Sequence, residues 1–214
     1  MIRVLLADDH PVVRSGYQRL LGMEADLRVV GEAASGDEAY ALHQAQMPDV
    51  LVTDLSMPGG GLELIRRVMR RDPRARVLVF SMHDSASLVR QAFEAGARGF
   101  LTKASPPESL VDAVRALAAG RRYLGPELPA SLLEPAAGAA GDDALSALSP
   151  REFEIFRLLA EGRSSSECAQ ALKLSPKTVA NHQTVIKDKL GVHTSAALAH
   201  LALLHGVIGL PAAV

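Results

Sequence analysis

The stretch VLVTDLSMPGGG, residues Val50–Gly61, decides the fold of this chain. Its first four residues form an apolar run rich in β-branched side chains, which is typical of a strand buried on both faces. The run ends at the carboxylate of Asp54, and the Met-Pro-Gly-Gly-Gly that follows must turn. Taken alone, such an acid more often begins a turn than carries chemistry. Open α/β sheets, however, place their ligands at the carboxyl ends of parallel strands.

Four more runs of strand length alternate with segments whose apolar residues have helical spacing. This alternation predicts a doubly wound α/β domain, with a five-stranded parallel sheet in the flavodoxin-like order 2-1-3-4-5 and helices on both faces. The predicted strands are Ile2–Ala7, Leu27–Gly31, Val50–Asp54, Arg76–Ser81 and Gly99–Thr102. Helices are expected from Pro11 to about Gly22, Ser35 to Gln46, Leu62 to about Arg71, Ser85 to Ala95 and Pro106 to about Ala119.

The predicted strand order brings polar side chains to one edge of the sheet. These are Asp8, Asp9, Asp54, Ser81 and Lys103. Three close carboxylates repel one another, and Mg²⁺, which prefers oxygen ligands, would relieve that repulsion. A carboxylate can also attack phosphorus to form an aspartyl phosphate, and a nearby ammonium and hydroxyl can donate to the phosphoryl oxygens. His10 and His83 flank this edge without metal-ligand spacing, so we expect loop residues that tune access.

The motifs DD, D-L-x-M-P-G and G-F-L-T-K, with a serine after RVLVF, resemble a response-regulator receiver domain over about residues 1–120. The resemblance implies that Asp54 accepts a phosphoryl group from a sensor histidine kinase. It implies that Asp8 and Asp9 hold Mg²⁺, together with Asp54 and the backbone carbonyl of Ser56. By the same resemblance Lys103 contacts the phosphoryl group, Ser81 is the switch hydroxyl, and Phe100 occupies the switch-aromatic position. For Phe100, an ordinary apolar strand residue is an equally good interpretation.

The composition and periodicity of the sequence change after the fifth predicted helix. Tyr123–Glu134 is compatible with a short helix, and PAAGAAGDDALSA, Pro135–Ala147, has the composition of a linker. We therefore predict a receiver domain at 1–121, a linker at 122–147 and a second domain at 148–214. Four helices are expected between Leu148 and Val207. The first begins with a Ser-Pro-Arg-Glu capping signal at Ser149.

A short helix, a tight Leu-Ser-Pro connection and a longer helix resemble a helix-turn-helix. The motif from S-P-R-E through S-P-K-T-V-x-N-H to K-L-G-V resembles the LuxR-type DNA-binding domain, so the whole chain resembles a NarL/FixJ-type response regulator. Its recognition helix would be Pro176–Leu190, with DNA-facing residues Lys177, Thr178, Asn181, His182, Thr184 and Lys187. Apolar residues of this helix are expected in the core, namely Val179, Val185, Ile186 and Leu190. One departure is Ala180, where many relatives carry a lysine, which predicts fewer phosphate contacts.

Composition and charge exclude few classes of protein function. The chain has 214 residues, and segment 1–145 carries 16 basic and 19 acidic residues against 7 and 5 in 146–214, so bulk charge cannot carry a DNA-binding argument. Cys168 is the single cysteine and is expected to be a buried structural thiol in a reducing compartment. The apolar start reaches Asp8 too early for a signal peptide or a membrane span. We expect a cytoplasmic protein with no membrane partner.

The favoured hypothesis is a transcription factor, not an enzyme, that binds DNA as a homodimer when phosphorylated. A haloacid-dehalogenase-like phosphatase would need a D-x-D pair, whereas Asp8 and Asp9 are adjacent and Asp54 is followed by Leu-Ser. A flavodoxin-like cofactor binder would need a Gly-rich phosphate loop where Asp8 and Asp9 stand. A regulator that works without phosphate remains an alternative, but the complete set of edge residues argues against it.

Overall fold

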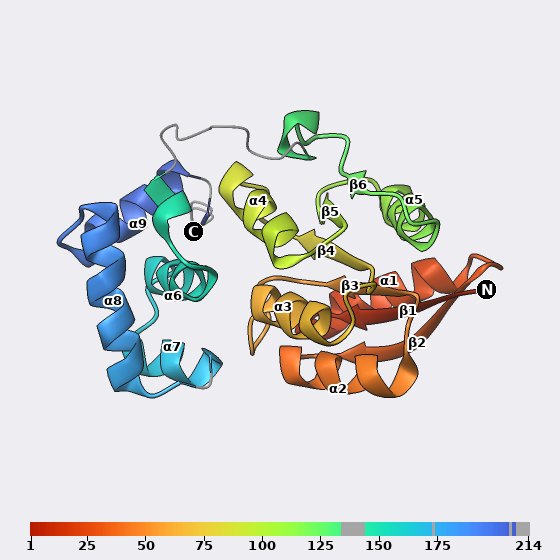
Figure 1. The fold of residues 1–214 in the computed structure, drawn as a ribbon, viewed down its shortest axis with the longest axis horizontal. Helices are drawn as coiled ribbons and strands as arrows, with labels where there is room; N and C mark the ends of the chain where they lie inside the picture. Colours follow the sequence, from red (N-terminus) through yellow and green to blue (C-terminus); the bar gives the residue numbers. More distant parts are fainter. Residues whose placement is uncertain (134–143, 173, 206, 209–214) are drawn as a thin grey trace. The chain divides into compact units, whose positions relative to one another are not determined.

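The computed structural model describes residues 1–133, 144–172, 174–205 and 207–208 (Figure 1). The chain divides into two compact units near residue 135. Strands and helices alternate in the first unit. Its elements are β1 (Ile2–Ala7), α1 (Pro11–Gly22), β2 (Leu27–Ala33), α2 (Gly36–Gln46), β3 (Val50–Thr53), α3 (Gly61–Arg71), β4 (Val77–Ser81), α4 (Ala86–Ala95), β5 (Gly99–Thr102), α5 (Pro107–Ala118), β6 (Tyr123–Leu124) and the 3₁₀ helix η1 (Ala130–Leu133).

The sheet is parallel with the order β2-β1-β3-β4-β5-β6, so the predicted order of the first five strands is confirmed. The sixth strand is a difference from the five predicted. Tyr123 and Leu124 pair with Gly99 and Phe100, inside the segment that was expected to belong to the linker and to contain only a short helix. Two residues are too few to produce a periodic pattern, so β6 could not be found in the sequence.

The strands bury both faces, as their continuous apolar runs predict. One face packs against α1 and α5, in a core cluster that includes Leu6, Val52 and Leu101 from the strands, Leu21 from α1 and Leu110 from α5. Side chains alternate along a strand, so the intervening strand residues lie on the other face. Helices α2 and α3 contact each other there (Figure 1), and Arg67 of α3 stacks 4.3 Å over the ring of Tyr40 of α2.

The spacing of Ser35 and Glu38 in the sequence predicts a capping box at the start of α2, and the structure differs from it in detail. The Ser35 hydroxyl accepts from the Glu38 N–H as expected, but the Glu38 carboxylate accepts from the Ala34 N–H, at 2.8 Å, instead of from Ser35. The same backbone stretch is satisfied one residue earlier, because a flexible glutamate reaches either neighbouring donor.

The second unit is all-α. Its elements are η2 (Ala144–Ala147), α6 (Pro150–Ala160), α7 (Ser165–Leu172), α8 (Pro176–Leu190) and α9 (Ser195–Leu204), so the four predicted helices are confirmed. The Ser149–Glu152 capping box is present in full. Residues 134–143 of the predicted linker lie outside the described residues, and η2 occupies its last four positions. Within the described residues, no helix is both long and apolar enough to cross a bilayer.

Candidate functional site

The β3–α3 loop brings the main chain beside Asp54 into a conformation that depends on glycine. Gly59 and Gly60 have φ of 87° and 74°, in the left-handed region that disfavours side chains. A Cβ on Gly61 would lie 2.3 Å from the backbone oxygen of Asp54 and 2.6 Å from the Cα of Leu55. The three glycines therefore allow the loop to fold tightly against the end of β3.

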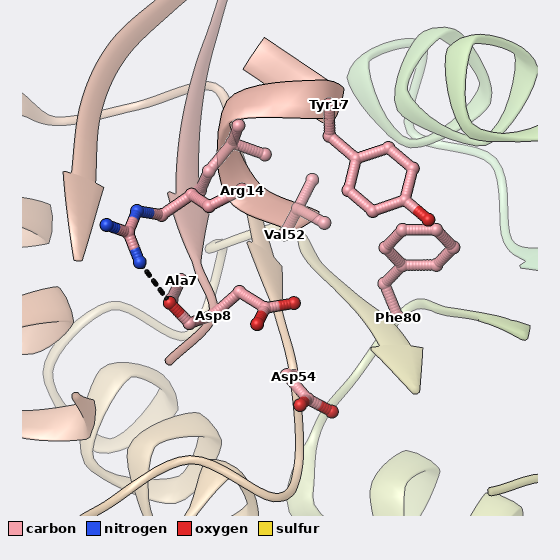
Figure 2. A pocket seen from close by; sticks show the side chains of 8 residues that line it. Ala7, Asp8, Arg14, Tyr17, Val52, Asp54 and Phe80 are labelled. Atoms are coloured by element: carbon pink, nitrogen blue, oxygen red, sulfur yellow. Dashed lines mark hydrogen bonds between the residues drawn. The ribbon is translucent and has the colours of Figure 1, made fainter. Parts of the chain in front are cut away.

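The predicted edge residues meet at the carboxyl ends of the strands. The ammonium of Lys103 lies 2.6 Å from Asp8 Oδ2 and 3.1 Å from Asp54 Oδ2, and all three side chains are at least nine-tenths buried. Figure 2 shows Asp8 and Asp54 beside each other below the Tyr17 and Phe80 rings. The other Asp54 oxygen, Oδ1, accepts from the Leu55 N–H at 2.7 Å.

Electrostatics holds Lys103 in its charged form. Burial lowers its pKa, but the charges of Asp54 and Asp8 and the hydrogen bond to Asp8 outweigh burial, so the pKa of Lys103 is raised. A buried cation between two carboxylates compensates charges that would otherwise be costly to desolvate. The site therefore presents a fixed positive charge next to a carboxylate that could act as a nucleophile.

Asp8, Asp9 and Asp54 each offer an oxygen to one small cluster, in which the ligand atoms lie within 4.8 Å of one another. Asp9 Oδ1 is buried and accepts no hydrogen bond of regular geometry among the described residues, but His10 Nδ1 lies 3.0 Å from it. A bound cation would give this oxygen a charged partner that no lysine or arginine supplies in the described part of the chain. The residues fit a hard divalent cation, since the set is dominated by carboxylate oxygens. His10 belongs to the same cluster, with Nδ1 3.2 Å from Asp8 Oδ1, although its spacing argued against it.

The remaining edge residues lie close by. Ser81 is fully buried at the end of β4, and its backbone oxygen accepts from the Lys103 N–H at 2.8 Å. Phe100 is completely buried inside β5, which agrees with its interpretation as a core residue. Ser56 is half-buried in the β3–α3 loop. The roles proposed for the Ser81 hydroxyl, the Phe100 ring and the Ser56 carbonyl stay predictions.

Sequence reasoning missed Arg14. Its Nη1 donates to the backbone oxygen of Asp8 at 2.6 Å (Figure 2). Its Nε donates to Glu32 at 3.0 Å. Arg14 therefore fixes the main chain of a proposed metal ligand. Tyr17, one turn further along α1, packs edge to face on Phe80 with ring centroids 4.6 Å apart. The helical spacing of α1 places Tyr17 among its apolar positions, as the structure confirms, but nothing in it distinguishes Arg14 from an ordinary helix-surface position.

In the second unit, α8 presents a polar face and an apolar face. The Ser175 hydroxyl caps its start by accepting from the Thr178 N–H at 3.0 Å, and Pro176 occupies the first turn. Val179, Ile186 and Leu190 are buried as predicted. The prediction for Val185 is wrong, because this side chain is 41% exposed and lies on the outward face.

The predicted DNA-facing residues of α8 all have some exposure. Lys177, Asn181 and Thr184 are exposed, whereas Thr178, His182 and Lys187 are half-buried. The hydroxyl of Thr184 donates to the Ala180 carbonyl at 3.2 Å, one turn back along the helix. The first turn of α6 anchors the far end of α8, since Lys189 Nζ lies 2.6 Å from Glu152 Oε2.

Two family models match the chain. The response regulator receiver domain matches residues 4–115, and the luxR family of bacterial regulatory proteins matches residues 146–202. The transcriptional activator protein ExaE of Pseudomonas putida is 42% identical over 212 residues, which are 98% of this chain and 99% of ExaE. The transcriptional regulatory protein UhpA of Salmonella typhimurium is 43% identical over 201 residues, or 94% of this chain and 97% of UhpA.

Two solved structures of response regulators are also similar to this chain. RcsB of Salmonella enterica serovar Typhimurium, bound to the promoter P1flhDC in the presence of the phosphomimetic BeF3-, has a TM-score of 0.71 at 30% identity and covers 95% of this chain and 98% of its own. A LuxR-family two-component response regulator from Aurantimonas has a TM-score of 0.59 at 46% identity, covering 60% of this chain and 92% of its own. The chain therefore belongs to the NarL/FixJ-type response regulators, transcription regulators and not enzymes, in which a receiver domain precedes a LuxR-type DNA-binding domain.

Proposed function

We propose that this response regulator is controlled by phosphorylation of Asp54. The observation that carries the proposal is the buried Lys103 ammonium, which lies 3.1 Å from Asp54 Oδ2 and 2.6 Å from Asp8 Oδ2. A lysine in this position can neutralise the phosphoryl oxygens as they approach the carboxylate. The phosphodonor would be a phosphohistidine of a sensor histidine kinase.

In the proposed reaction an Asp54 oxygen forms a bond to phosphorus while the bond from phosphorus to the donor histidine nitrogen breaks. The Leu55 N–H holds Oδ1 at 2.7 Å, so the orientation of the carboxylate is set before the donor arrives. Lys103 donates to the phosphoryl oxygens, and Ser81 supplies a hydroxyl at the end of β4. Asp8, Asp9, Asp54 and the backbone carbonyl of Ser56 would hold Mg²⁺, which when bound adds positive charge at the same phosphoryl oxygens.

The second unit supports the DNA-binding part of the proposal. The exposed Lys177 and Asn181 on α8 are suited to a phosphate contact and a paired hydrogen bond to adenine. The RcsB structure contains a promoter. For this chain we propose that DNA is bound by a homodimer. A single small helix-turn-helix unit contacts only one half-site, so tight binding requires two copies on two half-sites. We also propose a cytoplasmic location, because a bacterial regulator that binds DNA must reach the chromosome there.

The proposed domains are a receiver at 1–121, a linker at 122–147 and a DNA-binding domain at 148–214. The pairing of Tyr123–Leu124 with β5 argues for extending the receiver through Leu124. The remaining linker residues then connect two units that each have their own buried core.

The phosphorylation proposal is tested by incubating the full chain with Mg²⁺ and acetyl phosphate and measuring its intact mass. One phosphoryl group should be added, stable in acid and labile in base, as expected of an acyl phosphate. Asp54→Asn should abolish the addition, because the amide is not a nucleophile here. Full labelling of Asp54→Asn would show that the acceptor lies elsewhere.

A further inference from the structure

Lys103 stands in a β-turn whose two ends share one hydrogen-bond acceptor. The Ser105 N–H donates to the Thr102 backbone oxygen at 3.2 Å, so Lys103 and Ala104 are the central residues of the turn. A second turn follows β6, where the Leu128 N–H donates to the Gly125 oxygen at 3.0 Å. Glu127 is a central residue of this second turn.

The Glu127 carboxylate joins the two turns. Its Oε1 accepts from the Thr102 hydroxyl at 2.9 Å and from the Ser105 hydroxyl at 2.6 Å. Thr102 is 3% exposed at the end of β5, whereas Glu127 is exposed on the side away from these bonds. One carboxylate oxygen therefore binds the first and fourth residues of the turn that carries Lys103.

The carboxylate is ionised at neutral pH. Partial burial raises its pKa, but the hydrogen bonds from Ser105, Thr102 and the backbone outweigh burial, so the pKa of Glu127 is lowered. Bonds from hydroxyls to an ionised carboxylate are stronger than neutral ones. They therefore restrain the turn more than a neutral acceptor would.

Gly125 leaves the space that the carboxylate occupies. A Cβ at this position would lie 2.4 Å from Glu127 Oε1 and 3.0 Å from its Cδ. The N–H of Gly125 donates to the Phe100 oxygen at 2.9 Å, so the backbone under the carboxylate is fixed to β5. The acceptor thus rests against a rigid strand, and not on a freely moving tail.

We propose that Glu127 is a positioning residue for Lys103. By fixing both ends of the turn from Thr102 to Ser105, it holds the backbone from which the Lys103 ammonium reaches Asp54. The inference rests on the proposed function, in which Lys103 stabilises phosphoryl transfer to Asp54. A lysine has many rotamers, so the precision of its ammonium depends on how firmly its own backbone is held.

The test is the rate of phosphorylation of the full chain by acetyl phosphate, measured over a range of donor and Mg²⁺ concentrations. Glu127→Ala should lower the maximal rate about fivefold, the factor that corresponds to one net hydrogen bond. The Mg²⁺ concentration for half-maximal rate should stay unchanged, because Asp8 and Asp9 are untouched. Glu127→Gln keeps an acceptor oxygen and should recover part of the rate.

Asp26→Ala is the matched control. The Asp26 carboxylate also accepts two side-chain hydrogen bonds, from Arg115 at 2.9 and 2.6 Å, but Asp26 directly precedes β2, at the amino ends of the strands and so at the opposite end of the sheet from Lys103. It reports what loss of a surface carboxylate does to the receiver in general. The Lys103 side-chain resonances should move in Glu127→Ala and stay in place in Asp26→Ala.

Gly125→Ala provides a second route, because it displaces the carboxylate without removing it. It should slow phosphorylation in the same direction as Glu127→Ala, and the two changes combined should be no worse than Glu127→Ala alone. A wild-type rate in Glu127→Ala, or equal slowing in Asp26→Ala, would overturn the inference. Either result leaves the label on Asp54, so it is distinct from failure of the proposed acceptor.

Discussion

The edge of the receiver sheet and the outward face of α8 hold their polar side chains in opposite ways. Lys103 is buried between two carboxylates, with 5% of its side chain exposed. Lys177 and Asn181 on α8 are exposed to solvent. The Lys103 cluster is desolvated when the chain folds, so it is ready for phosphoryl transfer. The exposed side chains of α8 lose conformational freedom only when DNA binds. Substitutions should therefore alter stability and rate at the sheet edge, but DNA binding alone on the outward face of α8.

The largest expected effect comes from breaking the buried cluster. Lys103→Met leaves Asp8 and Asp54 without their cation, and removal of one partner from such a pair costs about 3–5 kcal/mol of unfolding free energy. The rate of phosphorylation should fall about 100-fold, because a preorganised charge is lost. Chemical denaturation should show that Mg²⁺ restores more stability to Lys103→Met than to the wild type. Equal stabilisation of the two by Mg²⁺ would contradict the proposed metal ligands.

Two neighbours on α8 sharpen the comparison within one helix. Ile186 is completely buried and Val185 is 41% exposed. Ile186→Ala should lower the free energy of unfolding by about 2–4 kcal/mol, since it removes buried methyl groups and leaves a cavity. Val185→Ala should change it by less than about 0.5 kcal/mol, as is usual for surface positions. Similar losses for the two variants, measured by urea denaturation, would mean that Val185 is buried in solution.

Substitutions on the outward face of α8 should change DNA binding without changing the free energy of unfolding. Asn181→Ala should weaken the preference for one base pair by about 1–3 kcal/mol. Lys177→Ala and Lys187→Ala should each reduce the slope of log affinity against log salt concentration by about one. Binding titrations over a salt series, with matched and singly substituted sites, measure both quantities. If Asn181→Ala lost affinity equally for every site, the residue would contact the DNA backbone and not a base.

The smallest effect concerns the anchor between α6 and α8. Burial raises the pKa of Glu152, but hydrogen bonds from Lys189 and Ser149 outweigh burial and lower it below the ordinary 4.5. A lowered pKa stabilises the fold above the ordinary value, and this stability is lost as pH falls through the folded-state pKa. Glu152→Gln should therefore cost about 1 kcal/mol near neutral pH. The difference from wild type should shrink below pH 4.5, and a constant difference across that range would contradict it.

The sequence predicted the strand order and the meeting of Asp8, Asp54 and Lys103 because both follow from long-range rules of parallel sheets. Apolar runs mark buried strands, and right-handed crossovers fix where their ends lie. The two-residue β6 and the contribution of Arg14 depend on packing, which leaves no periodic signal. Val185 was misplaced for a related reason. An apolar residue on a surface helix is normal when the opposite stripe already fills the core.

Gly61 and Gly125 both leave no room for a Cβ, but they constrain the evolution of this sequence differently. At Gly61 any side chain meets the main chain of Asp54 and Leu55, which cannot move without moving the acceptor. At Gly125 a side chain meets only the tip of Glu127, which can swing away. Selection should therefore hold Gly61 as long as Asp54 is used. A lineage that replaces Gly125, by contrast, should lose the acid at position 127 soon afterwards, because nothing then retains it.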